Sequence, residues 1–411
     1  MSAFGAGEIR FAQADPCGSW QDDRAPLPSP PAAMSPRVRS TGRLPGARAR
    51  RLRVLLWAGS ACAGVWAGGL AVAAPVPPTP SSQPSVAAHT YESWLETGRH
   101  AAEVGRYPDA IRAFQAAARA DPHRPEAEFE LGMSCERSGR MEEACQAYTR
   151  VLALRPDSAE TYYGLARVQE KLGRPRLAIE AYRHCLRLKP DEVGYYFALG
   201  LVLDQVGDSA AAEQAYREAL RRQPEYANAH FGLGLTYEKT NRLGPAAAEL
   251  EHAAHLHPDW PEAFFFLGRV RDRLGQHAAA IAALETAHRL KPDWPDALAV
   301  LGDSHAQAGE HEAAKACFQA LVALEPDSAQ ARFALGANAM VRGDLAQARE
   351  ILEQAVKLDP KHGQAHFVLG QVCLRLQDLP AARQEISALR PLAPDLAREL
   401  ASDLSAFEHK R

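Results

Sequence analysis

Side chains that could do chemistry are present in this chain, but they form no recognised catalytic pattern. The sequence has no phosphate-binding G-x-x-x-x-G-K-[ST], no G-x-S-x-G, no H-E-x-x-H and no G-x-G-x-x-G before a helix. Three histidines, His252, His255 and His257, lie close together, and two of them three residues apart could hold a metal ion. We expect them to lie on a solvated surface instead. The sequence therefore predicts a non-catalytic protein with no metal and no cofactor.

A strict repeat organises most of the chain. Proline recurs every 34 residues without insertion or deletion, at Pro122, Pro156, Pro190, Pro224, Pro258, Pro292, Pro326, Pro360 and Pro394. Other positions keep the same spacing: in the unit that ends near Pro156 they are Gly132, Ala144 and Tyr148. A fixed period of this length is the signature of a repeat architecture.

Each unit reads as a pair of helices. Phe129, Leu131 and Cys135 are spaced as on one helix, Gly139 marks a turn, and a second helix continues through Tyr148. The proline ends the second helix because it lacks an N–H and clashes with the preceding turn. The small residues should let two helices approach closely while the large ones fill the remaining space. One such hairpin cannot bury its apolar face alone, but stacked hairpins share a continuous core.

The cysteines do not form a disulfide framework. There are seven, with no C-x-x-C pair, which argues against a zinc ribbon or a thioredoxin-like site. Most of them should be small buried apolar side chains. Cys135 and Cys145 fall on the two helices of one hairpin, and they could be bridged if their Cβ atoms meet.

The 34-residue period, with its small residue, alanine, aromatic residue and terminal proline, resembles the tetratricopeptide repeat. The resemblance covers nine tandem repeats over residues 91–396, about three quarters of the chain. The repeats begin at Tyr91, Pro125, Ala159, Val193, Ala227, Pro261, Pro295, Ala329 and Gly363. The resemblance implies an all-α fold, a right-handed superhelix of helix pairs whose concave groove binds peptides or proteins.

A closing helix should follow the last repeat at residues 395–408. Residues 397–411 then make up the C-terminal capping helix and tail. Asp395 could cap its N-terminus. Leu400, Leu404 and Phe407 fall on one stripe together with Leu396. This stripe should cover the apolar end of repeat nine.

The groove is the candidate binding site, and the resemblance places the first helix of each pair along it. The fifth position of that helix is aromatic in seven repeats: Phe129, Tyr163, Phe197, Phe231, Phe265, Phe333 and Phe367. These rings either pack between neighbouring helices or present exposed faces to a partner's apolar side chains. The sequence leaves both interpretations open.

Charge divides the groove into two parts. Repeats two to six offer mixed charges, among them Arg167 and Arg269, whereas repeats seven and eight are more apolar and include Met340 and Val341. An apolar patch beside charged neighbours suits an amphipathic or extended segment. We therefore expect a partner to dock its apolar part on repeats seven and eight.

The N-terminal part of the chain differs from the repeats. Residues 1–53 are basic and should be disordered, with Met34 as a possible true start. Residues 54–74 carry no charge, and residues 75–90 form a proline-rich linker. The basic run, the apolar core and an A-x-A site ending at Ala73 predict a cleaved signal peptide. A retained membrane anchor is the alternative, and both interpretations place the repeats outside the cytoplasm.

The sequence thus predicts an exported, periplasmic scaffold for protein or peptide partners, acting in envelope assembly or secretion. Residues 1–90 have a net charge of +5, whereas the rest of the chain has a net charge of −8, which argues against nucleic-acid binding. A carbohydrate-handling subunit is an alternative, because an aromatic ladder can stack on sugar rings. A second alternative is an enzyme whose converging acids no motif reveals. The identity of the partner and the oligomeric state are not predicted.

Overall fold

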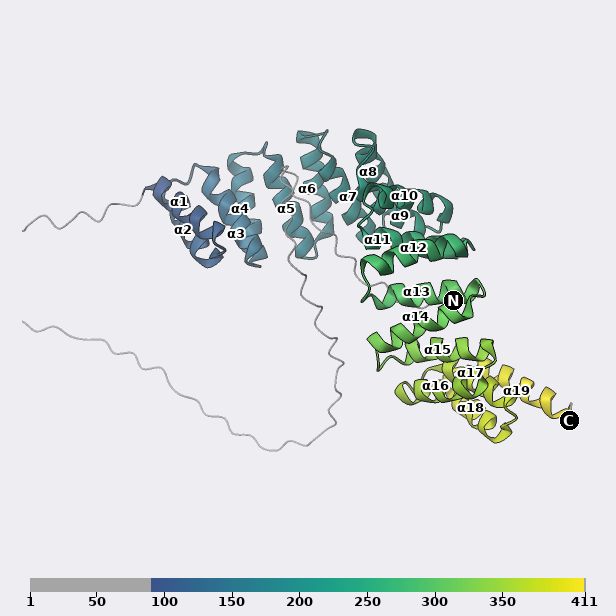
Figure 1. Ribbon diagram of the computed structural model, residues 1–411. Coiled ribbons are helices and arrows are strands. Elements are labelled where there is room, and N and C mark those ends of the chain that lie inside the picture. Colours follow the sequence, from purple (N-terminus) through teal and green to yellow (C-terminus); the bar gives the residue numbers. More distant parts are fainter. Residues whose placement is uncertain (1–89, 410–411) are drawn as a thin grey trace, which may run out of the picture. The chain divides into compact units, whose positions relative to one another are not determined.

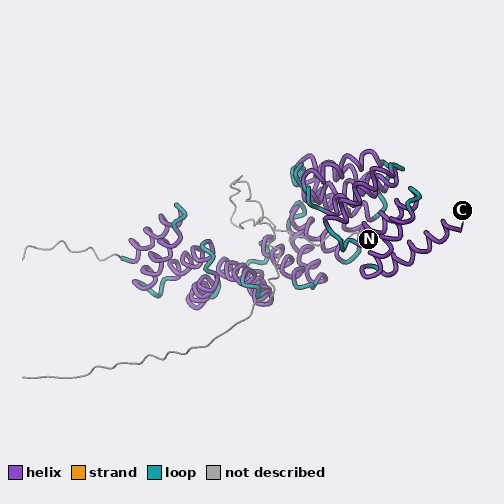
Figure 2. Tube along the Cα trace, turned by 90° about the horizontal axis from the view of Figure 1, so that it is seen from below, coloured by secondary structure: helices purple, strands orange, loops and turns teal. Residues whose placement is uncertain are grey.

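The computed structural model describes residues 90–409, which form α-helices joined by short loops (Figures 1 and 2). The first helices of the pairs are α1 (Tyr91–Glu103), α3 (Pro125–Arg137), α5 (Ala159–Lys171), α7 (Val193–Gln205), α9 (Ala227–Lys239), α11 (Pro261–Arg273), α13 (Pro295–Gln307), α15 (Ala329–Arg342) and α17 (Gly363–Arg375). The second helices are α2 (Tyr107–Ala120), α4 (Met141–Leu154), α6 (Pro175–Leu188), α8 (Ser209–Arg222), α10 (Leu243–Leu256), α12 (His277–Leu290), α14 (His311–Leu324), α16 (Leu345–Leu358) and α18 (Leu379–Leu392). A last helix, α19 (Pro394–His409), follows.

The predicted N-terminal segments, 1–53, 54–74 and the linker up to residue 89, lie outside the described residues. In the part that the structure describes, no helix has both the length and the apolar composition needed to cross a bilayer.

Packing follows the order of the chain. Each first helix packs against the second helix of its own pair, and each second helix packs against the first helix of the next pair. Figure 1 shows the pairs following one another from α1 to α18, with α19 after the last pair. The predicted all-α superhelix of stacked helix pairs is confirmed.

The two kinds of helix face opposite sides of this row. Consecutive first helices are in direct contact in several places: α1 with α3, α3 with α5, α7 with α9, α9 with α11, α11 with α13, and α15 with α17. Within residues 90–409 no two consecutive second helices come into comparable contact. Since the elements on the inside of a curve lie closest together, the first helices line the inner surface and the second helices the outer one.

The core alternates very small and very large side chains. Tyr148 is buried in the pair α3–α4, and a Cβ atom placed on Gly132 would lie only 2.6 Å from its ring. Tyr182 and Tyr216 are equally buried one and two repeats further on. Glycine on one helix thus makes room for the ring of the other, as the sequence predicts.

The turn inside each pair needs a residue with positive φ, which glycine adopts at least cost. Gly139 has φ of +81°, and Asn241 and Gln377 take the same place with φ of 59° and 64° in repeats five and nine. The second helices end two residues before the repeat proline, as at Leu154 before Pro156.

The last helix covers the end of the row. Leu400 and Leu404 of α19 are buried, and the Leu400 side chain lies against Gly370 of α17. The helix begins at Pro394, so the expectation that Asp395 caps it is wrong: Asp395 lies in the first turn and pairs with Arg398.

The Cys135–Cys145 bridge that the sequence left open is absent, because both residues are free thiols. Cys135 is buried between helices, and burial raises the pKa of its thiol to about 11. The Cys145 sulfur instead accepts a hydrogen bond from Nε2 of Gln169 at 3.1 Å. Each cysteine is thus used in local packing.

Candidate functional site

The aromatic ladder of the inner helices is a packing feature over much of its length. Phe231 is fully buried, and Phe265 and Phe197 retain only 6% and 8% exposure. Phe129, Tyr163, Phe333 and Phe367 are half-buried, and this list completes the seven rings. The interpretation of the ladder as a set of exposed ring faces is therefore wrong for its three central members.

Aromatic side chains from the inter-repeat loops cover these central rings. Trp260 lies 4.4 Å from Phe231, and Trp294 lies 4.5 Å from Phe265, measured between ring centroids. Tyr226 meets Phe197 edge-on at 5.7 Å. The sequence analysis missed this cover. The sequence does contain a pattern that could have predicted these covering side chains. An aromatic residue stands at the last position of three successive repeats, directly before the next first helix.

A row of carboxylates also escaped the sequence analysis. The twelfth position of the first helix is acidic in five successive repeats: Glu136, Glu170, Asp204, Glu238 and Asp272. In the first three of these repeats the second helix supplies a buried tyrosine, and the Tyr182 hydroxyl donates a hydrogen bond to Glu170. Burial raises the pKa of Tyr148 and of Tyr216, and the nearby charges of Glu136 and Asp204 act in the same direction. Glu170 therefore satisfies a hydroxyl group that reaches the inner surface from the core.

Burial changes the acidity of two members of this row. Desolvation raises the pKa of Glu170 above its ordinary value, although the hydrogen bond from Tyr182 acts in the opposite direction. Desolvation also raises the pKa of Asp204, and the Thr236 hydroxyl, 2.6 Å from its carboxylate, opposes the shift. Both groups are structural acids whose protonated form is favoured by their surroundings.

The two predicted arginines hold neighbouring repeats together. Arg167 lies 3.0 Å from Glu136 of the preceding repeat, and Lys171 lies 2.8 Å from the same carboxylate. Three repeats further on, Arg269 lies 2.7 Å from Glu238. The Arg269 guanidinium also lies over the ring of Phe266, 4.3 Å from its centroid. These charges are thus largely used within the inner surface.

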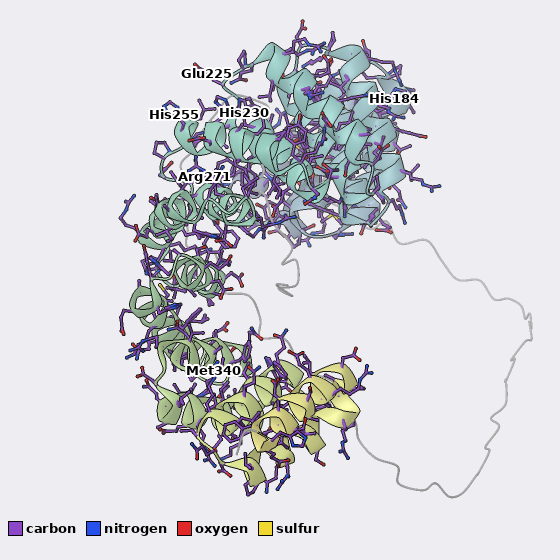
Figure 3. The ribbon with its side chains drawn as sticks, turned by 90° about the vertical axis from the view of Figure 1, so that its right-hand side faces the viewer. His184, Glu225, His230, His255, Arg271 and Met340 are labelled. Atoms are coloured by element: carbon purple, nitrogen blue, oxygen red, sulfur yellow. The ribbon has the colours of Figure 1, made fainter. Side chains whose placement is uncertain are left out.

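Repeat eight presents an exposed apolar side chain at the inner surface, whereas Ala299 of repeat seven is buried. Val341 is 58% exposed, and Met340 beside it is half-buried and packs against the C-terminal core cluster that includes Ala339 and Leu369. In Figure 3 Met340 lies where the helices border the inside of the arc, whereas His255 lies at the outer margin. Together with Ala337 these side chains form the apolar surface named here the α15 patch: Ala337, Met340 and Val341.

The histidines considered as metal ligands are separated by other contacts. His252 stacks on His230 at 5.1 Å, while Nδ1 of His230 lies 2.6 Å from Glu249. His255 and His257 are exposed. Nowhere in residues 90–409 do three histidine, cysteine or acidic side chains gather in an arrangement able to hold a metal ion.

Family models agree with this architecture. Three models described as tetratricopeptide repeat match the chain: one matches residues 95–159, 197–259 and 334–397, a second matches 273–338, and a third matches 159–192. A search of curated proteins finds no match.

Solved structures show the same fold. The C-terminal part of a repeat-containing protein from Cytophaga hutchinsonii is 17% identical and covers 58% of this chain and 97% of its own, with a TM-score of 0.51. MamA is 26% identical, covering 41% of this chain and 93% of its own, with a TM-score of 0.40. YrrB, described as having an unusual peptide-binding site, is 24% identical, covering 46% and 96%, with a TM-score of 0.43. With its helix pairs, its unbroken 34-residue period and the family models that match most of residues 95–397, the chain belongs to the tetratricopeptide repeat family.

Proposed function

We propose that the chain is a non-catalytic scaffold that binds a protein partner on the inner surface of its helix row. The observation that carries this proposal is the α15 patch: Val341 keeps 58% exposure while the aromatic ladder beside it is largely covered. An apolar side chain that stays exposed on a concave surface gains from burial against a partner, at about 25 cal/mol per Å². The partner's apolar residues dock there.

Substitutions that place charges in the patch test the proposal. A partner is first captured by cross-linking to the full-length chain, and its affinity is then measured by isothermal titration. The double variant Met340→Asp with Val341→Lys should weaken binding by about tenfold or more, because unpaired charges would be buried against apolar side chains. Unchanged affinity would reject the inner surface of repeat eight as the docking site.

A matched control lies on the outer surface of the same region. Leu324 and Leu358, on the second helices α14 and α16, are 43% and 41% exposed. The double variant Leu324→Asp with Leu358→Lys makes the same chemical change there and should leave the affinity unaltered. A loss of binding in this control would point to the outer surface instead.

The carbohydrate alternative keeps only part of the observation that supported it, the four half-buried rings Phe129, Tyr163, Phe333 and Phe367. It rested on exposed ring faces, whereas Phe197, Phe231 and Phe265 are buried beneath loop aromatics. Buried rings offer no face to a sugar. A glycan array probed with the full-length chain gives no binding if the scaffold proposal is right.

We further infer that the scaffold works outside the cytoplasm, in the periplasm, in envelope assembly or secretion. The support is the uncharged run of residues 54–74 behind an arginine-rich segment. Mass spectrometry of the protein from its own cells tests this: a mature chain that begins at Ala74 means cleavage. An N-terminus at Met1 or Met34 in a membrane fraction means that the segment is retained as an anchor, and a full-length cytoplasmic protein contradicts export.

A further inference from the structure

We propose that the partner segment carries a lysine or arginine next to its apolar anchor, and that this cation binds between Asp272 and Asp303 while the anchor covers the α15 patch. The inference rests on the proposed function and names the chemistry of its partner. The charged partners of the carboxylate row differ from one repeat to the next, and this difference carries the inference.

In two repeats, the acid that belongs to the row of carboxylates is neutralised by lysine or arginine side chains of this chain. Glu136 receives Arg167 and Lys171, which occupy the ninth and thirteenth positions of the next first helix. Glu238 receives two cations from the same two positions of the first helix that follows it. Arg273 Nη1 lies 3.2 Å from its carboxylate, and Arg269 lies closer still. Each of these acids therefore ends with two positive partners and little unsatisfied negative charge.

Repeat seven breaks this rule. Its ninth and thirteenth positions are Asp303 and Gln307, so Asp272 meets a carboxylate and an amide where Glu238 meets two arginines. Gln307 Nε2 lies 3.2 Å from Asp272 Oδ2, and His277 Nδ1 lies 2.9 Å from Asp272 Oδ1. Among residues 90–409, no lysine or arginine forms a salt bridge with Asp272 or Asp303. Negative charge therefore accumulates at the position from which the next repeat supplies cations to Glu136 and to Glu238.

The acidic spot lies one first helix before the apolar patch along the row of helix pairs. Asp303 is exposed, and Ala306 and Gln307 follow it at the i+3 and i+4 positions of α13, so all three share one face of that helix. The corresponding residues of the next first helix, α15, are Ala337, Met340 and Val341. The helices α13 and α15 are consecutive first helices that are not among the closely contacting pairs, so the step from acid to apolar surface is at least the roughly 8–10 Å of packed helices, or about three or more residues of an extended segment.

This arrangement selects among partners. An anionic segment would be repelled by Asp272 and Asp303, and a neutral apolar one would leave both carboxylates without a positive partner. A basic residue about three positions from an apolar pair fits both surfaces at once. Exposed ion pairs contribute about 0.2–1 kcal/mol, so the charge should improve affinity by up to about fivefold.

Defined peptides and the full-length chain test this by fluorescence anisotropy at low salt. Three labelled peptides share one leucine pair and differ only in the residue three positions before it, which is lysine, glutamine or glutamate. The lysine peptide should bind about two- to fivefold more tightly than the glutamine peptide, and the glutamate peptide should bind more weakly. The difference should fade as salt is raised.

Two variants separate the possible outcomes. The double variant Asp272→Asn with Asp303→Asn should bind all three peptides equally, whereas Glu285→Gln with Glu350→Gln, which removes two exposed acids from the second helices, should keep the preference for lysine. Equal binding of the lysine and glutamine peptides by the unmodified chain overturns this inference alone. Failure of all three peptides to bind, or binding that survives Met340→Asp with Val341→Lys, overturns the docking surface itself.

A second copy of the chain is the remaining occupant to test. Sedimentation of the unmodified chain over a range of concentrations should show no association that the Met340→Asp with Val341→Lys variant lacks. Concentration-dependent dimers that this variant abolishes would assign the α15 patch to self-association and overturn the inference.

Discussion

The glycine at the eighth position of a first helix decides how closely that helix can approach its partner. At Gly200 an added Cβ would lie 2.5 Å from the ring of Tyr216, which is buried. The ring has no room to withdraw, because packed interiors leave few voids. A methyl group at this position must therefore distort the pair α7–α8.

The expected result for Gly200→Ala is a loss of about 1–3 kcal/mol in the free energy of unfolding, as for other overpacked cores. Gly244→Ala is the control: Gly244 lies in α10 with nothing within 4 Å of an added Cβ. Because alanine favours a helix, that change should stabilise by up to about 1 kcal/mol. Urea unfolding measures both, and an unaltered midpoint for Gly200→Ala would contradict the packing argument.

The buried acids give the protein a pH dependence of known sign. The pKa of Asp204 is raised in the folded state by desolvation, so the folded chain binds more protons than the unfolded one. Stability then falls as pH rises from the ordinary pKa of aspartate through the raised value. Asp204→Asn should remove this fall, and unfolding curves across acidic to neutral pH will show it as a difference between variant and parent.

The exposed Asp259 provides the comparison, since Asp259→Asn should leave the pH profile unchanged. A parallel profile for Asp204→Asn and the parent chain would mean that the Asp204 carboxyl titrates normally.

Single residues were the hardest to interpret from the sequence. The seven ring positions are evident from the period, yet whether Phe231 is exposed depends on Trp260, which covers it from a loop. Likewise, Arg167 and Arg269 look free on a helix, but the acids that hold them come from the preceding repeat. A one-dimensional pattern does not state which loop folds back over which helix.

Helices, in contrast, were predictable almost to the residue. The first helices begin at the first residue of each 34-residue unit, because the proline three positions earlier prevents any continuation of the preceding helix. The last helix is the exception in detail: it starts at Pro394 itself, and α18 continues through Pro391. Proline tolerates the first turn of a helix, which explains the early start of α19.

At this scale α19 acts as the closing element. Leu400→Ala should detach it, since removal of a buried leucine costs about 2–5 kcal/mol and α19 packs on only one side of the row. Hydrogen exchange should show lost protection in α17–α19 and little change in α1–α14. Glu399→Ala, at an exposed position of the same helix, is the control and should leave protection unaltered.

Over the whole molecule, each repeat touches mainly its neighbours, so damage should remain local. Phe231→Ala removes a ring with no exposed surface that packs against Trp260 and Phe266, at a cost of about 3–5 kcal/mol. Exchange should accelerate in α9–α11 and much less in α1–α4. Equal acceleration everywhere would mean that the row unfolds as one unit.

The family, the fold and the inner surface follow from the period because that period fixes which residues meet. The partner does not follow from the period. The repeat determines only the stacked helix pairs, and the α15 patch is a local departure from the repeated residue pattern. Ala337, Met340 and Val341 stand where other repeats carry charges. The places where a regular sequence breaks its own pattern are therefore the informative ones for binding.

The contrast between touching first helices and separated second helices has a mechanical consequence. A row joined more firmly along one edge than along the other resists shortening on the joined side but yields to bending. Small rotations at each repeat boundary would add up along the row of helix pairs, so its curvature should change at a low energetic cost. A partner that binds the concave edge, as proposed above, would thus meet a surface whose curvature changes through small rotations at the repeat boundaries, with no helix unfolding.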